Sequence, residues 1–229
     1  MEQRSPEWFA ERIGRITSTS AKVIVNPRAT AAGRDSLRGE LVSEIATASF
    51  KHVPETFWMR HGTTYEPYAI AAYELEKGTH VAAGTFQVSD YNDLLGDSPD
   101  GVIGLGEGCL EAKCPNSENH GAVLATGEPY DSSYVWQMFW HLLVGGYEWC
   151  DFVSYHPDYP EHLRLFIRRY TMADIFPEKL IKGKKFKTKD DTPDKIITTE
   201  EQVNFAGLAI QTFIDDYQAT LVRLGLTLE

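Results

Sequence analysis

The sequence has no long hydrophobic run and no uncharged segment at its start. No stretch approaches the roughly 18 apolar residues that read as a candidate membrane-spanning helix. The opening residues, MEQRSPEWFAER, are too highly charged for a secretory signal. We therefore expect a protein without a membrane partner, located in the cytoplasm.

Cysteine is also scarce, since only Cys109, Cys114 and Cys150 are present and no C-x-x-C pair occurs. An odd number of cysteines without paired spacing argues against a disulfide framework and against a zinc knuckle. The pattern is typical of a protein that resides in a reducing cytosol.

Positive charge is in deficit, with 22 Lys and Arg against 33 Asp and Glu and a net charge of −11. This balance argues weakly against nucleic acid as a partner, but net charge describes a whole surface and not one groove within it. The basic residues are clustered, with Arg4, Arg12 and Arg15 near the start and six lysines between Lys179 and Lys189. A solvated charged face is one interpretation of the lysine run, and contact with DNA is the other.

The composition is otherwise that of a globular domain. The 229 residues are 42% hydrophobic and 24% charged, and they contain no repeat, low-complexity segment or flexible linker. We predict a single domain over residues 1–229.

The spacing of apolar residues predicts helices before, between and after a group of strands. The predicted helices span residues 5–14, 35–49, 64–77, 132–144 and 199–224. The predicted extended segments span residues 84–90, 94–104, 109–115, 150–157 and 163–170. This order predicts an α/β or α+β domain in which helices flank a mixed central sheet.

The predicted helix at 64–77 carries Pro67 near its start and Gly78 just after its end. Proline is tolerated in the first turn of a helix, and glycine commonly follows the last turn. This boundary would place Glu66 at the positive end of the helix dipole.

Chemistry-bearing residues are concentrated in SPDGVIGLGEGCLEAKCP, from Ser98 to Pro115. Asp100 lies where a strand leaves the SPDG turn, and Glu111 and Lys113 share one face of the next strand because side chains alternate. If the two strands pair, both carboxylates and the lysine converge. Two carboxylates are typical ligands of Mg²⁺, and a lysine beside them could activate water or stabilise negative charge. The competing interpretation is a surface ion pair on an edge strand, although CLEAKCP is apolar on both flanks.

Four blocks of the sequence, in order and at workable spacing, resemble the lambda exonuclease / YqaJ viral recombinase family of the PD-(D/E)xK nuclease superfamily. They span roughly residues 8–147 and read WFAERIGRITSTSA, HGTTYEPYA, SPDG…LEAKCP and YVWQMFWHLLV. The resemblance implies a restriction-endonuclease-like core, and the strand expected next matches CDFVSYHP.

The family resemblance implies a specific activity. It predicts a Mg²⁺-dependent 5′→3′ exonuclease, with Mn²⁺ as a substitute, that degrades one strand of duplex DNA from a 5′-phosphorylated end to mononucleotides. It also implies a homotrimeric ring, a phage or prophage origin, and work with a single-strand annealing protein in recombination. The alternatives are another PD-(D/E)xK nuclease, either a restriction-type endonuclease or a RecB-like repair nuclease, and a non-catalytic DNA-binding protein on the same fold.

The resemblance also assigns roles by position in the catalytic site. Asp100, Glu111 and the backbone carbonyl of Ala112 would hold metal, and Lys113 would contact or activate the attacking water. Two further residues would complete the site: Glu66 would support a second metal or its waters, and Gln137 would face the site from its helix. The residues alone favour a helix-dipole carboxylate for Glu66 and, for Gln137, a polar residue satisfied internally.

A basic pocket for the 5′-phosphate is implied near the start of the chain. Arg12 would bind the phosphate with Trp8 as its anchor, since a guanidinium binds phosphate in a bidentate manner. Ser18, Thr19, Ser20 and Ser98 are the candidate hydroxyl donors, and the choice among the first three stays open. We assign no role to His61, His120 or His141, whose spacing matches no metal motif, and only a weak supporting role to Asp97. The aromatic residues Trp136, Phe139 and Trp140 are expected in the core or in a subunit interface.

Overall fold

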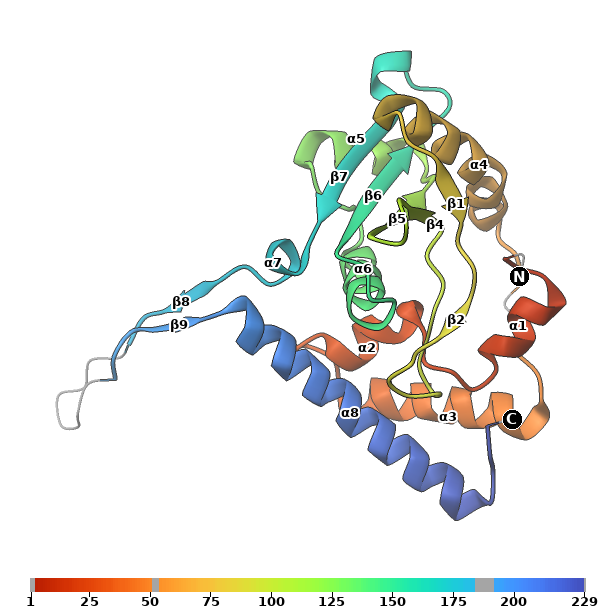
Figure 1. Cartoon of the computed structure of the whole chain (residues 1–229), viewed down its shortest axis with the longest axis vertical. Coiled ribbons are helices and arrows are strands. Elements are labelled where there is room, and N and C mark those ends of the chain that lie inside the picture. Colours follow the sequence, from red (N-terminus) through yellow and green to blue (C-terminus); the bar gives the residue numbers. More distant parts are fainter. Residues whose placement is uncertain (1–2, 51–53, 184–191, 229) are drawn as a thin grey trace.

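A five-stranded mixed sheet lies at the centre of the computed structural model, which describes residues 3–50, 54–183 and 192–228 (Figure 1). The strand order is β1-β4-β5-β6-β7, and the strands span Val81–Ala83, Gly101–Ile103, Gly108–Lys113, Trp149–Tyr155 and Leu165–Tyr170. Only β5 and β6 are parallel, and the other neighbours are antiparallel.

Two helices connect the parallel strands, because a parallel pair needs a crossover rather than a tight turn. Helix α5 (Ser117–Thr126) begins at the N-cap Asn116 and ends at Gly127, whose φ of 69° is left-handed. Helix α6 (Ser132–Val144) follows, with the Asp131 side chain accepting a hydrogen bond from the Ser133 amide. The crossover thus places α6 directly beside β5.

The two faces of the sheet are covered by different helices. Leu110 and Ala112 of β5 pack with Ala69 and Tyr73 of α4 (Phe57–Lys77). On the other face, the cluster that contains Cys109 of β5 includes residues of α5 and α6. Glu111 and Lys113 therefore point to the side of α6, since they alternate with Leu110 and Ala112 along the strand.

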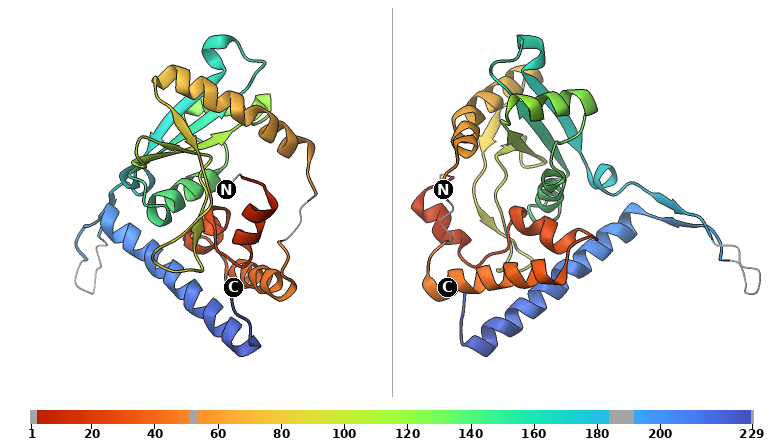
Figure 2. Two further views of the ribbon diagram at one scale, coloured as in Figure 1. Left: turned by 45° about the vertical axis from the view of Figure 1, so that its right-hand side comes forward. Right: turned by 180° about the vertical axis from the view of Figure 1, so that it is seen from behind.

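Helix α6 is buried on both sides, because a further layer of helices packs against the face that turns away from the sheet. Phe139 and Trp140 are fully buried in that second interface, which confirms their expected place in the core. Figure 2 shows this layer from two sides. Its members are α2 (Ala21–Val25), α3 (Ala31–Thr47) and α8 (Thr199–Leu224).

Short elements complete the fold. Helix α1 (Pro6–Arg12) and the 3₁₀ turn η1 (Ser18–Ser20) precede α2, while β2 (Gln87–Val88) pairs with β3 (Gly96–Asp97). The 3₁₀ turn η2 (Glu161–Leu163) and α7 (Met172–Ile175) flank β7. A hairpin of β8 (Lys179–Ile181) and β9 (Lys195–Ile197) extends away from the body (Figure 1).

The predicted fold class is confirmed, but two helices begin earlier than predicted: α3 begins at Ala31 rather than at Asp35, and α4 differs more strongly. Helix α4 begins at Phe57, with the Thr56 side chain as its N-cap, so Pro67 and Glu66 lie inside the helix. Glu66 is consequently not at the positive end of the dipole. Pro67 deprives the Thr63 carbonyl of its helical partner, but both residues are exposed, so water can satisfy that carbonyl.

The strand predictions differ from the structure at one edge. The segment 84–90 contributes only the short β2, which pairs with β3 outside the main sheet, and the edge strand is the earlier β1. Helix α5 lies in a segment for which we predicted no element. Of the six lysines between Lys179 and Lys189, only Lys179 and Lys182 belong to the described residues. In the described part of the chain, no helix combines the length and the apolar character needed to cross a membrane.

Candidate active site

Asp100 and Glu111 are held together by the pairing of the SPDG turn with β5. The Asp100 amide donates to the Leu110 carbonyl at 3.0 Å, and the Asp100 carboxylate accepts from the Ala112 amide at 2.8 Å. Asp100 thus bonds to the backbone on both sides of Glu111. The convergence expected from the sequence is present.

Lys113 lies between the two carboxylates. Its Nζ is 2.5 Å from Glu111 Oε1 and 3.6 Å from Asp100 Oδ2. The same ammonium group lies 5.2 Å from the ring centroid of Tyr134 on α6, within cation–π range. The three side chains of the predicted motif therefore form one cluster, closed on one side by α6.

Burial and mutual charge shift the pKa of each group in this cluster. Burial raises the pKa of Asp100 to about 7, with Glu111 and Glu66 adding to the effect and Lys113 opposing it. Burial also acts to raise the pKa of Glu111, but Lys113 and His141 outweigh it and lower the pKa to about 2. For Lys113, burial acts to lower the pKa, but Glu111 and Asp100 raise it above its ordinary value. The site therefore favours a cation between its two carboxylates.

This donor set fits a hard divalent cation. Asp100, Glu111 and the Ala112 carbonyl supply only oxygen, and Mg²⁺ is commonly held by one or two carboxylates together with water. The Lys113 ammonium already lies where positive charge is needed between the carboxylates. Within residues 3–50, 54–183 and 192–228, no group of three or more His, Cys, Asp or Glu side chains is arranged to hold a metal. A cation here would therefore need the Ala112 carbonyl and water as ligands in addition to the two carboxylates.

The two supporting residues implied by the resemblance lie on opposite sides of the sheet. Glu66, on α4, forms an ion pair of 2.9 Å with Arg4, although its charge still contributes to the raised pKa of Asp100. Gln137 lies on α6, and its Oε1 is buried without a hydrogen-bond partner in the described structure. Gln137 thus leaves a polar atom available on the helix that covers Glu111 and Lys113.

His141, to which we assigned no role, contacts the candidate metal ligand Glu111. Its Nε2 is 2.9 Å from Glu111 Oε2, and its Nδ1 is 2.7 Å from Asp97 Oδ1. Burial acts to lower the pKa of His141, but the two flanking carboxylates raise it well above its usual value. Helical spacing could have indicated this role from the sequence, because His141 follows Gln137 by four residues and lies on the same helix face.

Near the start of the chain, Arg12 lies in a pocket of aromatic and hydroxyl side chains. Its guanidinium stacks on Trp8, with 4.1 Å from Cζ to the ring centroid, and donates to Thr17 Oγ1 at 3.3 Å. The Thr17 hydroxyl is 3.1 Å from that of Thr19, so Thr19 is linked to Arg12 through a residue that we did not single out. Ser18 and Ser20 are buried in η1.

The Arg12 guanidinium is buried and incompletely satisfied. Arg12 is only 7% exposed, and its Nε has no hydrogen-bond partner in the described structure. Burial lowers the pKa of Arg12 to about 10, while Glu44 and Asp97 act in the opposite direction. Arg12 therefore remains charged at neutral pH and has hydrogen-bonding capacity for an anion.

Ser98 connects this pocket to the candidate catalytic cluster. The Trp8 indole Nε1 donates to the Ser98 hydroxyl at 3.1 Å, and the Gln3 amide donates to the Pro99 carbonyl at 2.8 Å. These bonds hold the N-terminal segment against the turn that carries Asp100. Arg12 and Asp100 are thus positioned by one continuous network.

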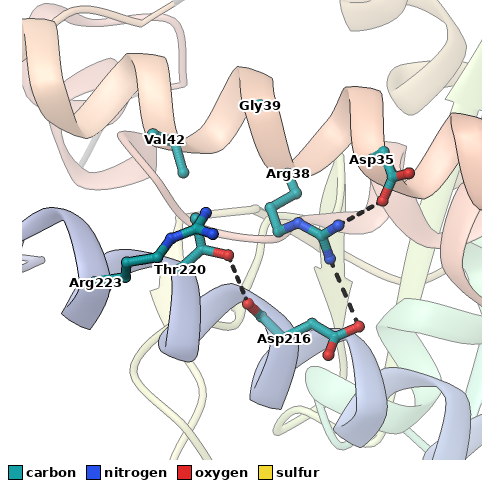
Figure 3. A pocket seen from close by; sticks show the side chains of 7 residues that line it. All are labelled: Asp35, Arg38, Gly39, Val42, Asp216, Thr220 and Arg223. Atoms are coloured by element: carbon teal, nitrogen blue, oxygen red, sulfur yellow. Dashed lines mark hydrogen bonds and ion pairs between the residues drawn. The ribbon is translucent and has the colours of Figure 1, made fainter.

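A separate cleft between α3 and α8 lies outside this arrangement (Figure 3). Its central cation, Arg38, is paired with Asp35 and, at 3.6 Å, with Asp216. These two carboxylates neutralise Arg38, which therefore differs from the incompletely satisfied Arg12.

Solved structures similar to this chain include exonucleases. An alkaline exonuclease from Laribacter hongkongensis, LHK-Exo, is 26% identical, has a TM-score of 0.76, and is matched over 96% of both chains. The same values hold for LHK-Exo in complex with dAMP. A phage related exonuclease from Haemophilus somnus 129PT shares the fold, with a TM-score of 0.62 and 10% identity over 92% of this chain and 96% of that one.

A comparison with curated proteins gave no match. The family described as the YqaJ-like viral recombinase domain matches residues 7–148, which include most of α1, the Arg12 pocket, the SPDG turn, β5 and α6. This match covers more than half of the chain and contains both the Arg12 pocket and the carboxylate–lysine cluster. The chain therefore belongs to the YqaJ-like viral recombinase domain family.

Proposed function

We propose that this protein is a divalent-metal-dependent exonuclease that degrades one strand of duplex DNA from a 5′-phosphorylated end. The observation that carries the proposal is the convergence of Asp100, Glu111 and Lys113 beside the buried Arg12 pocket. The exonuclease LHK-Exo, similar over 96% of the chain, supports the reaction class, and its complex with dAMP supports a nucleotide product.

Each part of the site has a role in this reaction. Asp100, Glu111 and the Ala112 carbonyl would hold Mg²⁺, for which Mn²⁺ could substitute. Such a cation, when bound, would lower the pKa of water and stabilise charge on a phosphate. Lys113, freed from its carboxylates and with its pKa lowered by the neighbouring cation, would orient or deprotonate the attacking water. Gln137 would accept a hydrogen bond from that water through its unpaired Oε1. Glu66 would support a second cation or its waters.

The Arg12 pocket would recognise the end of the DNA. A terminal phosphate is dianionic or nearly so, and a guanidinium provides parallel N–H donors for its oxygens. Trp8 holds the guanidinium plane, while the Thr17–Thr19 pair and Ser98 supply hydroxyl groups nearby. This pocket would fix the register of the strand relative to Asp100 and Glu111.

We further propose a homotrimeric ring that acts with a single-strand annealing protein in phage-type recombination. The ring would keep DNA close to the site while the outer surface stays acidic, which reconciles DNA binding with a net charge of −11. Exposed apolar residues on the protruding hairpin, Leu180, Ile181 and Ile196, provide a surface for contacts between subunits.

The direct test is digestion of a linear duplex labelled at a 5′-phosphorylated end, beside a covalently closed circle, with and without Mg²⁺. We expect the wild type to release mononucleotides from the linear DNA only, and only with metal. Lys113→Ala should lower the rate by about 100-fold or more, within the range for general acid–base groups. Lys77→Ala, an exposed lysine of α4, is the matched control and should be fully active.

Other outcomes would identify a different function. Cleavage of the circle would indicate an endonuclease, either restriction-type or RecB-like. Binding of DNA without metal-dependent cleavage in any arm would indicate a non-catalytic protein and would overturn the proposal.

A further inference from the structure

A chain of buried polar groups runs from β3 through α6 to β5, behind the candidate catalytic cluster. Asp97 and His141 are fully buried at 0% exposure, and Glu111 is 4% exposed. The links are 2.7 Å from Asp97 Oδ1 to His141 Nδ1 and 2.9 Å from His141 Nε2 to Glu111 Oε2. The imidazole thus joins two carboxylates from separate strands.

Stability alone does not account for this arrangement. Removing ionisable groups from water costs several kcal/mol per ion, and apolar residues of similar size often stabilise a core equally well. The second oxygen of Asp97, Oδ2, has no hydrogen-bond partner in the described structure, and it packs close to the backbone of Gly145. The network therefore has an unsatisfied hydrogen-bond acceptor at its Asp97 end, and its His141 end contacts Glu111.

The contacts of Glu111 divide its two oxygens between different tasks. Oε2 accepts from His141, whereas Oε1 contacts the positively charged end of Lys113. A cation that displaced the Lys113 ammonium would meet Oε1 while Oε2 stayed fixed. Residues that orient ligands in this manner typically change metal affinity by about 10–100-fold when they are removed.

We infer that His141, anchored by Asp97, is a positioning residue that fixes the Glu111 carboxylate for a divalent cation. This inference rests on the proposed metal-dependent function. Asp97 and His141 would act through Glu111 and would not themselves contact metal or DNA.

A pair of double variants isolates the hydrogen bond from the charge. Asp97→Asn with His141→Gln removes both charges but keeps an amide donor near the position of His141 Nε2. Asp97→Asn with His141→Leu has the same formal charge and no donor. Mn²⁺ affinity is measured on each metal-free protein by calorimetry and by the electron paramagnetic resonance of free Mn²⁺. We expect the leucine pair to bind Mn²⁺ about 10–100-fold more weakly, and the glutamine pair to stay within about threefold of the wild type.

Circular dichroism and thermal unfolding of the metal-free proteins separate positioning from folding. A purely structural role would lower the melting temperature without changing the Mn²⁺ affinity of the folded molecules, and that result would overturn the inference. If the leucine pair does not fold, Asp97→Ala gives the second measurement, because it retains His141 but frees its ring. Unchanged Mn²⁺ affinity in Asp97→Ala would likewise overturn the inference.

The inference and the proposed function fail in distinguishable ways. A wild type that neither binds Mn²⁺ nor cleaves linear DNA would remove the proposed function. A wild type that does both, with affinity unchanged in the leucine pair, would remove only the role of His141.

Discussion

At the residue scale, Asp100 carries a conflict between stability and the proposed function. Its carboxylate lies beside Glu111, and burial raises its pKa to about 7. The pKa of Asp100 is higher in the folded state than in the unfolded state. The contribution of Asp100 to the free energy of unfolding is therefore present at low pH and is lost as pH rises toward and through 7. A cation bound at neutral pH would relieve this cost.

Asp100→Asn should consequently stabilise the metal-free protein at pH 8 by about 1 kcal/mol or more, since one pKa unit corresponds to about 1.4 kcal/mol. The asparagine oxygen can still accept from the Ala112 amide. Urea unfolding with a chelator at pH 5 and pH 8 measures the difference, which should shrink at pH 5. An equal difference at both pH values would mean that the charge of Asp100 is not the cause.

Arg12 tests the phosphate pocket. Arg12→Lys keeps the charge but loses the planar fork and the stacking on Trp8, so we expect the preference for a 5′-phosphate over a 5′-hydroxyl end to fall by about 10-fold. Initial rates on the two duplexes measure this preference. Arg28→Lys, an exposed arginine, is the control and should keep it. An unchanged preference in Arg12→Lys would place phosphate recognition elsewhere.

How far the site could be predicted depends on how local its contacts are. Asp100, Glu111 and Lys113 follow from a turn signal and from alternation along one strand, both of which are local rules. The contacts of His141 with Asp97 and Glu111 join β3, α6 and β5, so no local pattern specifies them. The same holds for Thr17, which reaches Arg12 only after the chain turns between α1 and η1.

At the element scale, α5 is connected to the end of the β6–β7 hairpin by His120. Its Nδ1 is 2.8 Å from the Ser154 hydroxyl and its Nε2 is 2.8 Å from the Leu163 carbonyl, so the ring bridges β6 and η2. Burial lowers the pKa of His120, with the Leu163 bond opposing it and His156 adding to it. The folded state therefore favours the neutral ring.

The contribution of His120 to the free energy of unfolding should fall as pH drops below about 6.5, because His120 binds a proton less readily in the folded state. His120→Asn should flatten part of the change between pH 7 and pH 5 while lowering stability at pH 7. Urea unfolding at the two pH values measures both effects. His156, whose pKa is also lowered by burial, should add to this loss at low pH, whereas the raised pKa of Asp100 acts in the opposite direction. A variant with the full wild-type pH dependence would exclude His120 as a cause.

Element boundaries were least predictable where tertiary contacts override local signals. Pro67 suggested a helix start, yet α4 continues through it because Ala69 and Tyr73 pack on the sheet and the freed carbonyl faces solvent. The edge strand β1 has only three residues, too few for a clear alternating pattern. By contrast, α6 and α8 were predicted closely, since both combine strong apolar periodicity with capping residues.

At the scale of the whole molecule, net charge and DNA binding act in opposite directions. A net charge of −11 repels DNA over most of the surface, so binding depends on local contacts with phosphates. Each neutralised phosphate adds about −0.9 to the slope of log affinity against log salt. We expect DNA binding without metal to weaken steeply from 50 to 200 mM salt, measured by fluorescence anisotropy. A flat salt response would contradict binding through the phosphate backbone.

The protruding hairpin gives the proposed ring a testable contact. A two-stranded hairpin on its own is marginally stable in water, and Leu180 and Ile196 face each other across it while 59% and 56% exposed. Contact with a second copy would bury these side chains and stabilise the hairpin. Leu180→Thr with Ile196→Thr keeps the β-propensity and removes apolar surface, so the trimer should dissociate in sedimentation velocity. The number of nucleotides released per binding event should also fall, whereas Leu105→Thr, at a 99% exposed turn residue, should change neither. A wild type that sediments as a monomer would refute the ring, and a trimer unaffected by the double variant would place its interface elsewhere.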